Sequence, residues 1–271
     1  MQLVVCLFAA LTLCAQDAKE ILKRALDHDE RNLAILDTYM YERKTIVRFL
    51  DKIGRIEDTK EDIDEVFHVD GSKVERHMVK NGKTISGKDE ATEQKRVDRE
   101  VARIKAEGPK DRAKRRGETD KDKREEMEGR REILEGYDVK LLASEKLNGR
   151  LCWGLDGSPR PDFRGKGRRA DQIKKLKGKA WIDQATYELV KLELNSLDTI
   201  SFGWFLFRLS AGAQIRIDQA LVNNEVWLPQ FVGIRADARI LGKLKRIDIA
   251  ISYTKFRKFS SDSKLIVGES R

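Results

Sequence analysis

The side chains that most often carry catalysis or bind metals are few in this chain and form no recognisable motif. The 271 residues include three histidines, His28, His68 and His77, and three cysteines. No HExxH or CxxC spacing occurs, and no serine lies in a GxSxG elbow. We expect His28 to be solvated on a charged helix. His68 and His77 fall in neighbouring predicted strands, where they either face each other as a surface pair or share a metal ion. We favour the surface pair and predict no metal site.

Three further positions carry weak chemical signals that have simpler interpretations. Cys152 lies between two large apolar residues of an alternating pattern, which favours a buried thiol over a nucleophile. The segment 165–170, GKGRRA, fits a loose dinucleotide fingerprint, but two prolines just before it argue against the preceding strand that such a site needs. Asp183 is better explained by turn formation than by acid catalysis. The sequence therefore makes no positive case for an enzyme, a catalytic residue or a cofactor.

The charge balance favours an anionic partner. Charged residues make up 37% of the chain and the net charge is +9, which attracts membrane surfaces, nucleic acid or acidic proteins. The densest positive stretch is 160–179, with nine Lys or Arg and two Asp. It holds one aromatic residue, Phe163, and no base-reading motif, so we predict no nucleic-acid binding. We predict a basic surface for an anionic lipid or protein partner, formed by Arg164, Lys166, Arg168, Arg169, Lys174, Lys175 and Lys177.

The N-terminal run from Met1 to Ala15 is apolar and uncharged. It is shorter than the ~20 residues that a membrane-spanning helix needs. It matches the apolar core of a secretory signal peptide with cleavage after Ala15, although the usual basic start is missing. The alternatives are acylation at Cys14 and a buried first helix of a cytosolic protein. We predict a signal peptide over residues 1–15 and a single domain over 16–271 in the periplasm, with the lipid-anchored form less favoured.

Strand-like alternation dominates the chain after an amphipathic helix predicted over 17–36. The hairpin signals are Asn-Gly pairs and short polar turns. The stretch 178–194, GKAWIDQATYELVKLEL, indicates two strands around a turn. We count ten or eleven strands joined mostly by short connections, which pair antiparallel. The predicted fold is therefore mainly β, as an unclosed antiparallel barrel with an N-terminal helix, because a meander of this length must curl.

The segment 87–132 interrupts this pattern with a dense mixture of charges. From Lys88 to Glu132 there are 16 Lys or Arg and 14 Asp or Glu. Apolar residues at helical spacing predict one amphipathic helix over about 90–106, ended by Gly108-Pro109. The part from Lys110 to Arg131 is either a solvated helix or partly disordered. We interpret the whole as a surface helical insertion, with a movable lid or a docking arm as the functional alternative.

Four segments in fixed order carry a wider pattern: 137–161 (YDVKLLASEKLNGRLCWGLDGSPRP), 175–194 (KLKGKAWIDQATYELVKLEL), 226–229 (VWLP) and 251–259 (ISYTKFRKF). This pattern resembles the LolA/LolB-like superfamily, specifically outer membrane lipoprotein-sorting proteins. The resemblance implies a half-open antiparallel β-barrel with helices over its mouth, an apolar cavity for acyl chains, and no catalysis.

A barrel too wide for its own side chains leaves a cavity, and an apolar cavity admits acyl chains. As cavity residues we predict the aromatic and aliphatic positions Phe202, Trp204, Leu206, Trp227, Ile249 and Ile251, each with ordinary core packing as its alternative. The function predicted from these observations is a periplasmic carrier or binding protein for lipid or lipoprotein acyl chains, with sorting to the outer membrane as its narrower form. The alternative is a non-catalytic envelope adaptor that uses the barrel as a scaffold for protein docking.

Overall fold

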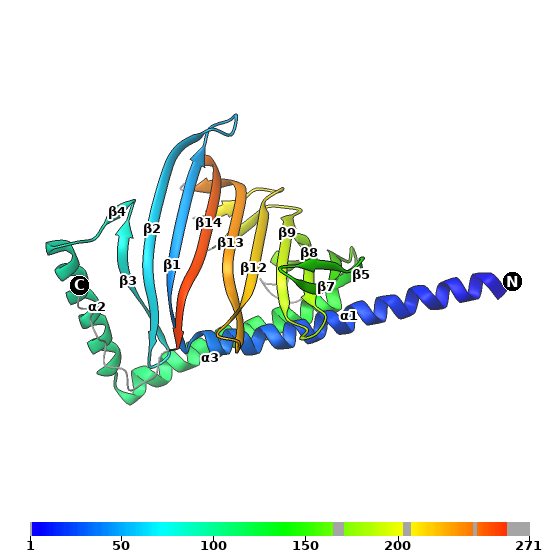
Figure 1. Ribbon diagram of the computed structural model, residues 1–271, viewed down its shortest axis with the longest axis horizontal. Coiled ribbons are helices and arrows are strands. Elements are labelled where there is room, and N and C mark those ends of the chain that lie inside the picture. Colours follow the sequence, from blue (N-terminus) through cyan, green and yellow to red (C-terminus); the bar gives the residue numbers. More distant parts are fainter. Residues whose placement is uncertain (1, 165–170, 203–206, 241–242, 259–271) are drawn as a thin grey trace.

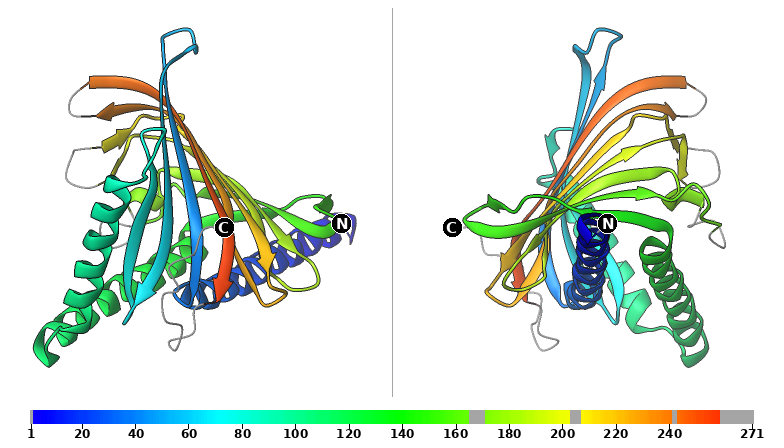
Figure 2. Two further views of the ribbon diagram at one scale, coloured as in Figure 1. Left: turned by 60° about the vertical axis from the view of Figure 1, so that its left-hand side comes forward. Right: turned by 90° about the vertical axis from the view of Figure 1, so that its right-hand side faces the viewer.

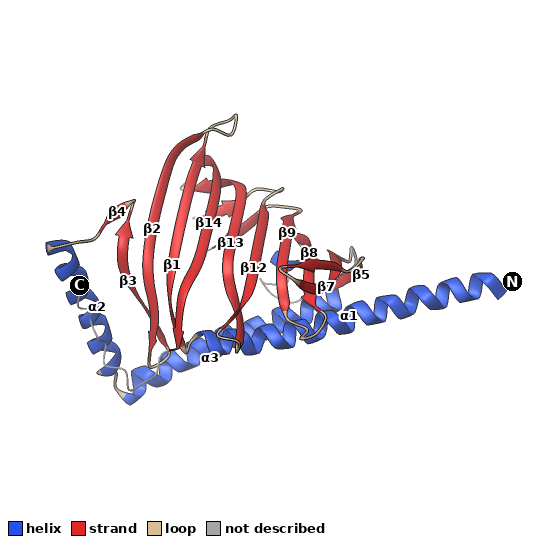
Figure 3. Ribbon diagram, in the orientation of Figure 1, coloured by secondary structure: helices blue, strands red, loops and turns tan. Residues whose placement is uncertain are grey.

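The computed structural model describes residues 2–164, 171–202, 207–240 and 243–258. Its long helices are α1 (Gln2–Leu36), α2 (Lys88–Lys105) and α3 (Pro109–Gly136). The strands are β1 (Tyr39–Leu50), β2 (Ile56–Val69), β3 (Ser72–Lys80), β4 (Lys83–Thr84), β5 (Tyr137–Leu141), β6 (Glu145–Leu147), β7 (Arg150–Pro159), β8 (Leu176–Asp183), β9 (Leu189–Ser196), β10 (Ile200–Phe202), β11 (Phe207–Leu209), β12 (Gln214–Val222), β13 (Val226–Ile240) and β14 (Lys243–Lys258). Figure 3 shows the resulting mainly β architecture.

The strands form one antiparallel sheet that does not close. Eleven of them follow the path β4-β3-β2-β1-β14-β13-β12-β9-β8-β7-β5, while β6, β10 and β11 pair beside it. The predicted mainly β, unclosed antiparallel fold is confirmed, but the structure describes fourteen strands where ten or eleven were predicted, because short strands such as β4, β6, β10 and β11 span only two or three residues each. The sheet is long and strongly twisted, and its two outer ends are separate (Figures 1 and 2). The first strand, β1, pairs with the last, β14, so the first and last strands of the chain lie side by side within the sheet.

The hairpins lie where the sequence places its turn residues. Asn81, Asn148 and Asp70 have positive φ values of 49°, 48° and 49° and are each followed by a glycine with positive φ. Two consecutive residues with positive φ give the turn whose twist matches that of the flanking strands. These local signals explain why the strand boundaries follow the sequence closely.

Strand register places a continuous apolar row on one face of the sheet. Leu194 on β9 pairs with Ile215 on β12, which pairs with Ile234 on β13, which in turn pairs with Ile249 on β14. Directly opposed residues in an antiparallel sheet point to the same side. The row therefore forms one aliphatic surface across four strands.

Helix α1 is longer than predicted, because it continues without a break from Gln2 to Leu36. Its C-terminal half crosses the lower ends of the strands, while its N-terminal part projects past β5 (Figure 1). The predicted leader lies within the projecting part, and its removal stays a prediction. Among the described helices, none is both long and apolar enough to cross a membrane.

The charged insertion forms two helices, with residues 106–108 between them. Helix α2 packs on β2 and β3 through Val97 and Ile104, and Gly108-Pro109 separates it from α3, as expected. The open question over Lys110 to Arg131 is answered by a continuous helix, and its described side chains are mostly exposed. Helix α3 returns beside α1 beneath the sheet (Figures 1 and 2).

Candidate functional site

An apolar cavity of about 570 Å³ lies between the helices and one end of the sheet. Its walls come from α1 and α3 on one side and from β5, β7, β8 and β9 on the other. Most of the lining residues are either aliphatic or glycine. The lining residues are Leu22, Ala25, Leu26, Asp29, Gly129, Ile133, Tyr137, Val139, Leu155, Gly157, Gln172, Ile173, Leu176, Gly178, Lys179, Ala180, Ile182, Leu189, Leu192 and Leu194.

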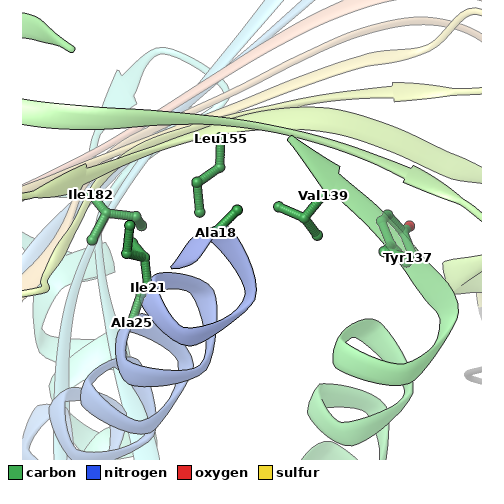
Figure 4. Packing of buried hydrophobic residues seen from close by; sticks show 7 residues of the cluster. All are labelled: Ala18, Ile21, Ala25, Tyr137, Val139, Leu155 and Ile182. Atoms are coloured by element: carbon green, nitrogen blue, oxygen red, sulfur yellow. The ribbon is translucent and has the colours of Figure 1, made fainter. Parts of the chain in front are cut away.

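Helix α1 covers the cavity because its apolar residues repeat at helical spacing. Ala18, Ile21 and Ala25 lie one turn apart and are buried against the sheet. Figure 4 shows them pointing toward Leu155 and Ile182 on β7 and β8. Small side chains at two of the three contacts allow the helix to approach the strands closely, which closes this side of the cavity.

On the sheet side, small residues leave the space that the cavity occupies. Gly157, Gly178 and Ala180 line it from β7 and β8, next to the larger Leu192 and Leu194 of β9. Tyr137 closes one corner, and its hydroxyl lies 2.7 Å and 2.6 Å from the carbonyl oxygens of residues 173 and 176. Burial raises the pKa of this phenol, so it stays protonated and donates at neutral pH.

Polar side chains are rare in the cavity lining, which holds Asp29, Gln172 and Lys179 besides Tyr137. Asp29 accepts a hydrogen bond from Gln219 Nε2 at 3.0 Å. Neither a histidine nor a cysteine is among the lining residues that the structure describes. The arrangement can therefore bind an apolar ligand by burial, with polar groups only at a few points.

A cluster of polar contacts fixes α1 to the turn between β8 and β9. His28 Nδ1 lies 2.9 Å from Glu188 Oε1, and Asn32 Nδ2 donates to Glu188 Oε2 at 2.6 Å. One turn earlier, the Arg24 guanidinium stacks 4.8 Å from the ring of Tyr187. The expectation that His28 is solvated was wrong, because the helix face that carries it docks on this turn. These contacts join the cover of the cavity to its wall.

The predicted cavity residues on β13 and β14 lie away from this cavity. Trp227 is buried in a separate cluster with Cys152 and Trp181, where Arg150 stacks 5.3 Å from its ring. Ile249 and Ile251 are half-buried on the same sheet face as the lining residues of β9, but three strands away. As a ligand site these three positions stay a prediction.

The remaining predicted cavity residues fall at the gap between β10 and β11. Phe202 ends β10, where its backbone pairs with Phe207. Trp204 and Leu206 lie outside the described residues. Strand β11 covers a nearby part of the apolar sheet face, because its Leu209 packs on Ala236 and Ile247.

The basic surface is described only in part. Lys166, Arg168 and Arg169 lie outside the described residues. Arg164 is exposed and donates to the carbonyl of Pro161, and Lys177 is exposed on β8. Lys174 pairs with Asp171 at 2.6 Å, and Lys175 pairs with Asp198 at 3.3 Å and donates to the carbonyl of Thr199. The two ion pairs neutralise part of the positive charge that the sequence places here.

Asp183 has a structural role, as the sequence indicated. Its carboxylate accepts hydrogen bonds from Thr186 N and Oγ1, both at 2.8 Å, and from the Arg150 guanidinium at 2.6 Å and 3.0 Å. Burial raises the pKa of this carboxyl, but Arg150 and Thr186 outweigh the effect and hold the pKa below its usual value. Asp183 is thus a charged turn residue.

The other reactive side chains are also placed in structural settings. Cys152 is buried and unpaired, as predicted, and burial raises the pKa of its thiol. The expected pairing of the two strand histidines was wrong. His68 lies opposite Lys73, and His77 lies opposite Asp64 and contacts its carboxylate at 2.6 Å. In the described parts of the chain, no group of three or more His, Cys, Asp or Glu could hold a metal ion.

Sequence reasoning missed the lining contributed by α1 and by the glycines of β7 and β8. The helical repeat of Ala18, Ile21 and Ala25 was a usable signal, because small apolar residues on one helix face predict close packing. The glycines gave a weaker signal, since Gly in a strand marks either a bulge or a close approach.

No family model and no curated protein matches the chain. Among solved structures, a DUF1329 family protein from Desulfovibrio piger is 11% identical, with 92% of this chain and 95% of that chain covered and a TM-score of 0.35.

Two further structures are equally distant. An outer membrane lipoprotein-sorting protein domain from Vibrio parahaemolyticus is 11% identical, with 90% and 95% covered and a TM-score of 0.34. A LolA superfamily protein from Nitrosomonas europaea is 11% identical, with 93% and 97% covered and a TM-score of 0.34. Both bear the names of the groups that the sequence pattern resembles, and none of the three assigns a ligand to this chain.

Proposed function

We propose that this chain is a non-catalytic binding protein for acyl chains, which it holds in the cavity between α1, α3 and strands β5 and β7–β9. The observation that carries the proposal is the cavity of about 570 Å³ with its mostly aliphatic lining. Moving an acyl chain from water into such a site gains ~0.8 kcal/mol per buried CH₂. The scarcity of polar lining groups favours a hydrocarbon ligand over a polar metabolite.

The volume of the cavity suits one long acyl chain. In a protein core, a cavity of about 150 Å³ accommodates benzene, so 570 Å³ corresponds to roughly twenty carbon atoms. Burial of about twenty methylenes contributes on the order of 16 kcal/mol, which exceeds most estimates of the cost of association. A single chain therefore binds with useful affinity, and a second chain of a lipid would need space beyond this cavity.

In its narrower form, the proposal places the protein in the periplasm as a carrier of lipid or lipoprotein acyl chains, including lipoproteins sorted to the outer membrane. The predicted leader over residues 1–15 supports export, and the net charge of +9 favours encounter with anionic headgroups. The anchor of a lipoprotein is chemically an acyl chain, so the cavity suits free lipid and anchor alike.

The proposal is tested by filling the cavity from the sheet. Leu192 is half-buried on β9 and lines the cavity, so Leu192→Trp places an indole where the ligand would lie. Leu221→Trp is the matched control, because Leu221 is 42% exposed on β12 and lines no part of the cavity. Binding of a dansyl-labelled undecanoic acid is followed by fluorescence titration.

We expect Leu192→Trp to weaken binding at least tenfold, because displacing even a few methylenes costs about 2–3 kcal/mol. Leu221→Trp should stay within twofold of the unmodified protein. Equal affinity in both variants, or no binding by the unmodified protein, would refute the proposal. Mass spectrometry of protein purified from its native source adds a second test, and a stoichiometric protein partner without lipid would favour the envelope adaptor.

A further inference from the structure

Two charged side chains of α2 cover the outer edge of β3. Glu93 Oε1 accepts a hydrogen bond from the backbone N–H of His77 at 2.8 Å, and Arg96 Nη2 donates to the backbone carbonyl of Glu75. The two side chains also bind each other, with Arg96 Nη2 2.7 Å from Glu93 Oε1. Strand β4 pairs only with Val79 and Lys80, so this side-chain pair covers the part of the edge that β4 does not reach.

The covered backbone groups are those that a neighbouring strand would use. In an antiparallel ladder, the N–H of residue i+1 and the carbonyl of residue i−1 both bond to the strand beside residue i. When residue i is Arg76, these groups are the N–H of His77 and the carbonyl of Glu75. Glu93 supplies the acceptor and Arg96 the donor, so the ion pair substitutes for one repeat of a strand.

The same two groups are complementary to a second copy of themselves. A two-fold axis beside Arg76 would bring the Glu75 carbonyl of one copy to the His77 N–H of the other, and the reverse. The opposed Arg76 side chains would repel, but each already pairs with Glu65 at 2.5 Å.

We propose that β3 is a masked self-association edge, that its partner is β3 of a second copy of this chain, and that the Glu93–Arg96 pair is the mask. Exposed strand edges pair readily with other strands, and proteins block them with charged side chains or a covering helix. Here the charged side chains act at the edge itself, and α2 holds them in place because Val97 packs against Val74 and its neighbours. The inference is independent of the ligand cavity, which lies at the other end of the sheet.

The test traps the predicted pairing with a disulfide. Opposed residues of a non-hydrogen-bonded antiparallel pair have Cα atoms ~4.5 Å apart, within the range of a disulfide. Arg76→Cys should therefore cross-link two copies only when the edge is free. It is introduced into the unmodified chain and into Glu93→Ala/Arg96→Ala, and the disulfide-linked fraction is measured on non-reducing gels, with the linked peptide identified by mass spectrometry.

We expect the linked fraction to rise at least tenfold when the mask is removed. Two controls should not respond: Arg99→Cys in place of Arg76→Cys, because Arg99 lies exposed on α2, and Gln94→Ala/Asp98→Ala in place of the mask variant. An equal linked fraction with and without the mask would overturn the proposal. If the double variant fails to fold by circular dichroism, Arg96→Ala alone frees the Glu75 carbonyl and must give a smaller rise, and its absence would equally overturn the proposal.

Discussion

Gly178→Ala is the substitution for which the structure makes the sharpest stability prediction. Gly178 lies on β8, where it lines the cavity and pairs with Leu194 of β9. A Cβ added at Gly178 would meet the backbone carbonyl oxygen of Glu193 and lie 2.7 Å from Leu194 Cδ2. The leucine methyl can rotate away, but the carbonyl belongs to the ladder between the two strands. The added methyl must therefore push the strands apart.

The expected cost follows from two opposing effects. Overpacking of this kind destabilises by about 1–3 kcal/mol, and the rigid backbone contact places this case at the upper end. The loss of glycine's freedom in the unfolded chain returns about 0.4–1 kcal/mol. We therefore expect Gly178→Ala to lower the free energy of unfolding by about 2 kcal/mol and the melting temperature by about 4–8 °C.

The matched control is Gly157→Ala on the neighbouring strand β7. A Cβ at Gly157 would lie 3.3 Å from Tyr137 Cδ1, a ring that can shift by a few tenths of an ångström, so we expect a change below ~0.5 kcal/mol. Urea unfolding followed by circular dichroism measures both variants. Equal stability of the two variants would refute the view that the β8–β9 ladder leaves no space for a side chain at Gly178.

Three further predictions concern charged contacts. Arg150→Ala should destabilise the protein by about 2–3 kcal/mol in urea unfolding, because it leaves buried Asp183 with neutral donors only; a change below ~0.5 kcal/mol would contradict this. Glu188→Ala should speed hydrogen exchange in the C-terminal half of α1, since Glu188 binds two side chains of that helix; unchanged exchange would count against the anchoring role. The pKa of Glu93 is about 2, below the usual 4.5, mainly because its carboxylate binds Arg96 and also because it accepts a hydrogen bond from the His77 amide. Ionised Glu93 therefore stabilises the fold fully above about pH 4.5, and this contribution is lost as the pH falls toward 2. The stability difference between Glu93→Gln and the unmodified chain should shrink over that range, and a constant difference would argue otherwise.

The sequence by itself determined the local elements, because their signals are local. Asn81-Gly82 and Asn148-Gly149 form turns because asparagine and glycine adopt positive φ readily. Gly108-Pro109 separates two helices because proline fits the first turn of a helix and not its interior. The alternation of Ile247, Ile249 and Ile251 matches the strand period, and similar alternation in other segments predicted the β class and an approximate number of strands.

Long-range pairing was decided only by the tertiary structure. The pairing of β1 with β14 joins residues that lie 196 to 219 positions apart, and it depends on which edges remain free after the local hairpins form. The docking of His28 and Asn32 on Glu188 likewise required α1 to cross β9, which no local pattern specifies. The contacts of Glu93 and Arg96 with the backbone of β3 likewise depend on tertiary structure, because they require α2 to pack on β3.

The cavity shows most clearly where sequence reasoning ends. The sequence analysis favoured large aromatic residues such as Trp227. In the structure Trp227 is buried in a separate cluster with Cys152 and Trp181 and does not line the cavity. The cavity lies where Gly157, Gly178 and Ala180 stand opposite a helix. A large side chain occupies volume, whereas a cavity needs missing volume between elements held apart by other contacts. Composition can show how much apolar surface a chain carries, but only the packing of α1 and α3 against the strands decides where that surface stays unfilled.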